Sequence, residues 1–137
     1  MERLTHGPTV KAPAERFTGD AWIDVISPGA RPPFVRANLV RFAPGARTAW
    51  HRHTRGQTLH VLAGIGLVQT RGEEINVLRP GDTVRTGPGE WHWHGAAPTH
   101  FMVHLGLLEG GAPDGEPDTE WAGHVTDSEY DPPPAEA

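Results

Sequence analysis

The chain has 137 residues, a formal net charge of −5 and no cysteine. This length fits one domain, and an acidic balance without a basic cluster argues against a nucleic-acid partner. The lack of cysteine excludes disulfides and thiolate ligands, so a bound metal would need nitrogen and oxygen ligands. The N-terminus lacks the pattern of a signal peptide, and no apolar stretch is long enough to span a membrane, so we expect a cytoplasmic protein.

Short strands separated by turns are predicted along most of the chain. Each of these segments is rich in β-branched and aromatic residues and is bounded by turn-forming sequences with glycine or proline. They cover residues 21–27, 34–42, 57–64, 65–70, 74–78, 83–86 and 100–108. Strands at this short, regular spacing predict an all-β antiparallel sandwich or barrel.

The C-terminal part of the sequence has a different pattern. Thr126 and Glu129 have the spacing of a helix capping box, which predicts a short helical segment there. The tail from Asp131 is rich in proline and has few apolar residues, so we expect its last residues to be disordered.

Two pairs of histidines indicate a metal site. His51 and His53 are two residues apart, so on a strand both side chains leave the same face, and Gln57 joins them if the segment between bends back. His92 and His94 form a second pair after a tight glycine turn. One such pair is more often a surface feature, but two pairs favour a metal site. Imidazole with an oxygen donor suits manganese, iron, zinc, nickel or copper, so these ligands do not choose the metal.

The spacing of these residues resembles the two sequence motifs of the cupin superfamily. The first motif is matched at Gly45, His51, His53, Gln57 and Gly64, with glutamine in place of the usual glutamate. The second is matched at Gly81, residues 87–89 and His92, with Gly87 where proline is common and Ala96 where asparagine is common. The resemblance implies a double-stranded β-helix barrel at about 34–109, within a single domain of residues 1–137 that has a C-terminal extension at 110–137. It also implies a metal held by His51, His53, Gln57 and His92.

A narrower resemblance covers almost the whole chain. The stretches "PGARTAWHRH", "PGEWHWHGAAPT" and "HVTDSEY" are similar to the small bacterial cupins typified by the manganese-dependent hydroxynitrile lyases, a group labelled (R)-mandelonitrile lyase-like. That group commonly has glutamine as the fourth ligand. The resemblance implies manganese, a small-molecule substrate and a homodimer or homotetramer. Thr54 and Arg55 depart from the group, which has a proline and an apolar residue there, and this departure leaves the substrate open.

The neutral ligand Gln57 favours polar rather than oxidative chemistry. An amide leaves the full charge on a divalent ion, which makes it a stronger Lewis acid toward a hydroxyl, a carbonyl or cyanide. The resemblance to the hydroxynitrile lyases, with which this chemistry agrees, implies an enzyme that cleaves or forms cyanohydrins. His104 is the predicted base, because the last strand of a cupin faces the metal, and His94 is a second base or a partner that orients a ligand. The alternatives are a metal-dependent dioxygenase or other oxidoreductase, and a protein that binds metal and ligand without turnover.

Other residues near the motifs have two interpretations. Trp50, Trp91 and Trp93 flank the histidines and either pack in the core or form a wall of the substrate pocket. His60 has the opposite strand parity to Gln57, so we expect it to point away from the metal.

Overall fold

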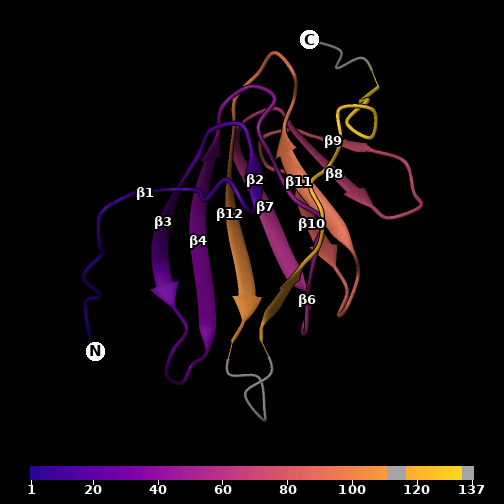
Figure 1. Ribbon diagram of the computed structural model, residues 1–137. Coiled ribbons are helices and arrows are strands. Elements are labelled where there is room, and N and C mark those ends of the chain that lie inside the picture. The colour runs from indigo at the N-terminus through magenta and orange to yellow at the C-terminus, as the bar shows by residue number, and fades with distance from the viewer. Residues whose placement is uncertain (111–116, 134–137) are drawn as a thin grey trace.

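The computed structural model describes residues 1–110 and 117–133, and Figure 1 shows their strands curled into two facing sheets. The first sheet is antiparallel, and most of its strands have eight residues. In spatial order it contains β1 (Val10–Lys11), β3 (Ala21–Pro28), β4 (Val35–Phe42), β12 (Met102–Glu109), β7 (Gln57–Gly64) and β10 (Thr83–Thr86). β12 lies between β4 and β7, so a strand late in the sequence runs through the middle of this sheet.

The second sheet is built from shorter strands. In spatial order it contains β13 (Thr119–Trp121), β6 (His51–His53), β11 (His92–Ala96), β5 (Arg47–Thr48) and β2 (Phe17–Thr18). β8 (Gly66–Thr70) also pairs with β11, and β9 (Asn76–Leu78) pairs with β8. Strands before residue 34 and after residue 109 therefore pair into the same two sheets as the strands between them.

The predicted all-β antiparallel barrel is confirmed. The seven predicted segments correspond to β3, β4, β7, β8, β9, β10 and β12, with ends that agree within about two residues. The strands β1, β2, β5 and β13 were not predicted as strands, because elements of two or three residues are too short to have a period. β6 (His51–His53) and β11 (His92–Ala96) were also absent from the predicted segments, although their histidine pairs were interpreted as if they lay on strands.

The predicted C-terminal helix is wrong for the described residues, which contain no helix. The capping box itself forms, since the Glu129 amide donates to the Thr126 hydroxyl at 3.1 Å and the Thr126 amide donates to the Glu129 carboxylate at 3.0 Å. These bonds close a single turn over 127–129. Three prolines begin at Pro132, and proline cannot donate the amide hydrogen bond that would extend the turn. The tail that is predicted to be disordered begins at Asp131, and its residues 134–137 lie outside the described residues.

Apolar side chains fill the space between the sheets at one end of the barrel. Phe42, Val61 and Met102 are buried there with the aromatic ring of Phe17. Trp50 and Trp93 pack with Leu67 and Val125 in a second buried cluster. For these two tryptophans the core interpretation is therefore correct.

Trp91 lies outside both clusters and serves as a platform for cations. The guanidinium of Arg52 lies 4.7 Å from its ring centroid, and that of Arg71 lies 5.0 Å from it. Arg71 also lies 5.0 Å from the ring of Trp50. These stacks cover the flank of the histidine-bearing strands and do not line the cavity described below.

No helix capable of spanning a bilayer occurs within residues 1–110 and 117–133. The cytoplasmic location remains a prediction.

Gly64 is expected to be intolerant of any side chain. It has φ +78°, and a Cβ at this position would overlap the backbone carbonyl oxygen of Phe101 on the adjoining loop. Gly64→Ala should lower the free energy of unfolding by at least about 2 kcal/mol, as measured by urea denaturation. Gly72→Ala is the matched control, since Gly72 has φ +85° but no heavy atom within 4 Å of the added carbon. It should cost only about 1 kcal/mol. Equal losses in the two variants would contradict this steric explanation.

Candidate metal centre and cavity

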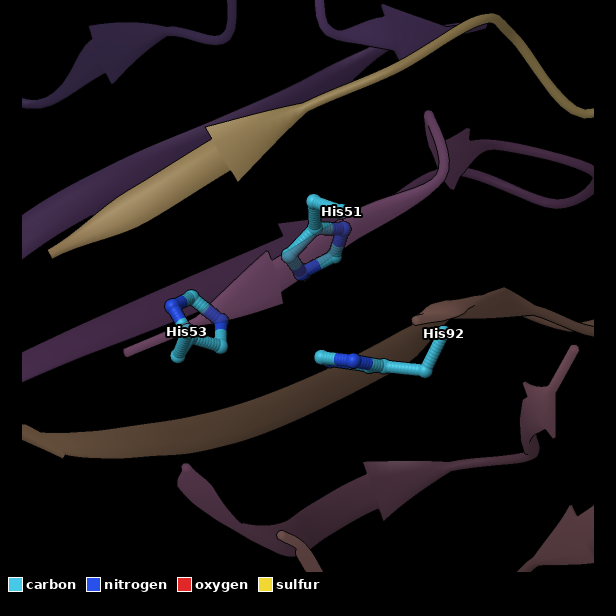
Figure 2. Close-up of side chains that lie close together, drawn as sticks. All are labelled: His51, His53 and His92. Atoms are coloured by element: carbon cyan, nitrogen blue, oxygen red, sulfur yellow. The ribbon is translucent and has the colours of Figure 1, made fainter. Parts of the chain in front are cut away.

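Two neighbouring strands bring three histidines together. His51 on β6 is the register partner of His92 on β11, and His53 follows on the same face of β6. One nitrogen from each of the three rings lies within 4.8 Å of the others, and all three residues are buried. Figure 2 shows the rings approaching one another from the two strands. The structure thus gathers three of the four predicted ligands in one place.

Backbone carbonyls fix the orientation of two of these rings. Nδ1 of His51 donates a hydrogen bond to the carbonyl of Ala49 at 2.8 Å, and Nδ1 of His92 donates to the carbonyl of Glu90 at 2.9 Å. A carbonyl oxygen can only accept, so the proton of each neutral ring is on Nδ1. The lone pair of each Nε2 is then available to a metal, the arrangement typical of metal-binding histidines.

The third ring is oriented by a strand that follows much later in the sequence. Nδ1 of His53 lies 2.9 Å from the hydroxyl of Thr119, its register partner on β13. Nε2 of His53 is buried and has no hydrogen-bond partner among the described residues. A buried nitrogen without a partner is costly, and a metal ion at the centre of the three rings would satisfy it.

Gln57, the fourth predicted ligand, reaches the cluster from the opposite sheet. It begins β7, and its Oε1 lies 3.2 Å from Nε2 of His92. A turn closed by the hydrogen bond from the Gly56 amide to the His53 carbonyl carries the chain across, with Gly56 at φ +80°. Three imidazoles and one amide oxygen therefore converge, and this donor set fits a divalent metal ion.

Burial keeps the three histidines neutral. Desolvation, followed by repulsion from His92, lowers the pKa of His53 from 6.5 to about 4. The same two causes hold the pKa of His51 well below its usual value, and desolvation lowers the pKa of His92. Neutral imidazoles present lone pairs at neutral pH, so protons do not compete with a metal there.

His94 and His104, the predicted bases, form a buried pair beside this cluster. Nε2 of His104 on β12 lies 3.0 Å from Nδ1 of His94 on β11, so one ring donates to the other across the barrel. Desolvation lowers the pKa of His104 to about 4 and holds the pKa of His94 well below its usual value. Both rings are therefore in the proton-accepting form at neutral pH. The ring of His94 lies 5.1 Å from that of His51.

A cavity of about 340 Å³ contacts both groups of histidines. Its lining residues come from the two sheets and from the segments around residues 13–17 and 117–121, and they include His51, His53, Gln57, His94 and His104. Apolar side chains on other sides of the cavity are Phe17, Ile23, Val40, Leu108 and Trp121. The cavity thus combines a polar, histidine-lined region with apolar surface that suits the organic part of a small molecule.

Two residues of β13 contribute to the site without having been predicted. Trp121 stacks on His51 with ring centroids 4.6 Å apart and lines the cavity, and Thr119 contacts His53 as described. The segment "TEW" is too short to show strand alternation, and it follows a glycine- and proline-rich stretch that resembles a loop. The signal in the sequence that could have indicated these two residues is their alternate placement, with Thr119 and Trp121 on either side of Glu120.

Cationic side chains also face the cavity. Arg16 stacks on Trp121 with its guanidinium 5.1 Å from the ring centroid, and Arg36 contributes to the low pKa of His53 through its charge. Asp118 supplies an acidic group to the same lining.

The remaining residues singled out from the sequence lie elsewhere. His60 is outside this cavity, where its Nδ1 lies 2.8 Å from the hydroxyl of Thr83, in agreement with its strand parity. Arg55 donates to the carbonyl of Gly110 at 3.2 Å and lies 3.6 Å from the carboxylate of Glu109. Arg55 therefore does not line the cavity.

Comparison with known proteins agrees with this architecture. The cupin domain profile matches residues 38–105, which include both histidine pairs. The chain is 48% identical over 130 residues to a protein of Granulicella tundricola named (R)-mandelonitrile lyase, covering 95% of this chain and 97% of the relative. The chain belongs to the cupin family.

Solved cupin structures have the same barrel. A cupin-like protein from Thermotoga maritima superposes with a TM-score of 0.80 and 36% identity, over 95% of each chain. A cupin-2 domain protein from Rhodospirillum rubrum superposes with a TM-score of 0.69 and 16% identity, over 90% of this chain and 78% of the other, which supports the fold alone. The predicted resemblance to cupins, and to this lyase in particular, is confirmed.

Removal of one histidine should abolish metal binding. Purified protein is expected to hold one divalent ion per chain by elemental analysis, and His53→Ala should lose it because Nε2 of His53 is the buried nitrogen without a partner. His60→Ala is the control, since this histidine lies outside the cluster and should leave the metal content unchanged. Full metal occupancy in His53→Ala would contradict the assignment.

The low pKa of His104 should make the metal-free protein sensitive to acid. Between pH 6.5 and about 4 the unfolded chain binds a proton at this residue that the folded chain does not, so the free energy of unfolding falls as the pH falls. Each pH unit in this window should cost about 1.4 kcal/mol per such histidine. Urea unfolding of EDTA-treated protein at several pH values measures this, and His104→Gln should show a smaller fall. An unchanged pH dependence in this variant would contradict the prediction.

Proposed function

We propose that this cupin is a metal-dependent lyase that cleaves or forms cyanohydrins, with manganese held by His51, His53, Gln57 and His92. The observation that carries the proposal is the 48% identity, over nearly the full length of both chains, to a protein named (R)-mandelonitrile lyase. The donor set of three histidines and a neutral amide, next to a second buried histidine pair in one cavity, supports it.

The bound metal would supply Lewis acidity for a substrate oxygen or cyano group. In the direction of cleavage, His104 takes the proton of the substrate hydroxyl as its oxygen becomes a carbonyl. The bond between the carbinol carbon and the cyano carbon breaks, and its electron pair leaves with cyanide. Cyanide takes up the proton that His104 received and departs as hydrogen cyanide, which restores the neutral ring of His104. His94 orients the ring of His104 through their hydrogen bond and offers a second site for the proton.

The rest of the cavity suits this chemistry in charge and polarity. Arg16 and Arg36 place positive charge on the lining, which favours the developing negative charge of the leaving cyanide. Phe17, Val40 and Leu108 offer apolar surface for an aryl or alkyl group. The volume of about 340 Å³ falls within the range of small-molecule pockets.

Release of cyanide from mandelonitrile by manganese-loaded protein tests the proposal. His104→Gln should retain the metal and lose at least about 100-fold in rate, because it removes the proton-accepting ring. His60→Gln, at a histidine outside the cavity, should keep the wild-type rate. Absence of cyanohydrin cleavage by fully loaded protein would overturn the proposal, and oxygen consumption with small diketone or thiol substrates would favour the dioxygenase alternative instead.

A further inference from the structure

The inner face of the first sheet forms three rows across the cavity. Strand register places Val40 beside His104, Asn38 beside Gly106, and Arg36 beside Leu108. All six residues line the cavity. Val40 and His104 lie nearest to the packed core of Phe42 and Met102, so the row of Asn38 and Gly106 lies midway between this floor and the row that contains Arg36.

Asn38 is the polar residue of the middle row, and the oxygen of its amide is not satisfied by the described part of the fold. Its Oδ1 is buried and has no hydrogen-bond partner among residues 1–110 and 117–133. A buried amide oxygen without a donor costs about 1–3 kcal/mol. A half-turn of the terminal amide exchanges its oxygen and nitrogen, so this group can present an acceptor or a donor to whatever occupies the cavity.

Gly106, the register partner of Asn38 on β12, has room over its backbone for an added carbon atom. A Cβ at position 106 would lie 3.5 Å from Nε2 of Gln57, 3.5 Å from Cε1 of His104 and 3.6 Å from Cδ2 of Leu59, all of them ordinary contacts. The glycine is thus surrounded by the amide ligand on one side and the predicted base on another. A molecule held between Gln57 and His104 would lie over Gly106 and within reach of the strand that carries Asn38.

We infer that Asn38 is a substrate-positioning residue, whose amide hydrogen-bonds the hydroxyl of an uncharged α-hydroxy compound lying over Gly106. This inference rests on the proposed function for the choice of compound. Asn38 would fix how the hydroxyl-bearing carbon faces His104, with the apolar substituent directed to the remaining lining. It therefore also determines which enantiomer places its hydroxyl correctly.

A pair of ligands that differ in one hydroxyl tests the inference independently of turnover. Mandelamide keeps the α-hydroxyl but has no cyanide to lose, and 2-phenylacetamide lacks the hydroxyl. Calorimetric titration of manganese-loaded protein gives the affinity of each. Asn38→Leu should weaken the binding of mandelamide by about five- to tenfold more than the binding of 2-phenylacetamide, which is the effect of one net hydrogen bond. Leu39→Ala, at the next residue on the opposite face of β4, should not change this ratio.

Two further measurements separate positioning from a structural role. Asn38→Leu should leave the free energy of unfolding equal or higher, because Oδ1 has no partner to lose. Asn38→Ser, which keeps a hydroxyl, should restore part of the preference for mandelamide. If mandelonitrile is cleaved, Asn38→Leu should raise KM and lower the selectivity between its enantiomers.

The following results overturn the inference. They are an equal loss of affinity for both amides in Asn38→Leu, no binding of mandelamide to the wild-type protein, or a clear loss of stability in Asn38→Leu. Failure of cyanide release alone would overturn the proposed lyase activity and leave the mandelamide comparison as the test of Asn38.

Discussion

The backbone pairing of His51 with His92 is the contact on which the whole site depends. It joins two short strands at one residue pair, and the alternation of side chains then places His53 and His94 on the same inner face. A slip of one residue in either strand would turn its histidines away from the cavity. Gln57 can complete the cluster because the turn at Gly56 returns the chain to the opposite sheet at the same level.

This arrangement buries polar histidine rings in a part of the barrel that would otherwise be apolar. Nearby groups in the sequence offset the cost of this burial. The rings of His51 and His92 bond to carbonyls two residues before them, so each ligand carries its own orienting group. The neutral state of the rings avoids the larger cost of buried charge. The unpartnered nitrogen of His53 is a remaining cost that a bound cation would offset.

The sequence was sufficient to predict the barrel and the histidine cluster, for reasons that are local. Alternating strands of eight residues and fixed motif spacing both lie within short stretches, as in "HRHTRGQ". The contributions of Thr119 and Trp121 could not be predicted, because they depend on a pairing with β6 across more than sixty residues and on a strand too short to show a period. The prediction of a helix from Thr126 and Glu129 was wrong because the capping hydrogen bonds close only one turn. The prolines that follow prevent this turn from extending into a helix. The role of Asn38 likewise emerges only from its neighbours on other strands.

The position of β13 has a consequence for folding. This strand pairs with β6 through the very residues that form the cluster, since Trp121 opposes His51 and Thr119 opposes His53. Docking of the C-terminal strand and the affinity of the cluster for a ligand are therefore thermodynamically linked, because anything that binds the ordered rings also holds this edge of the sheet closed. Amide hydrogen exchange in residues 119–121 would accordingly slow as the cluster is filled.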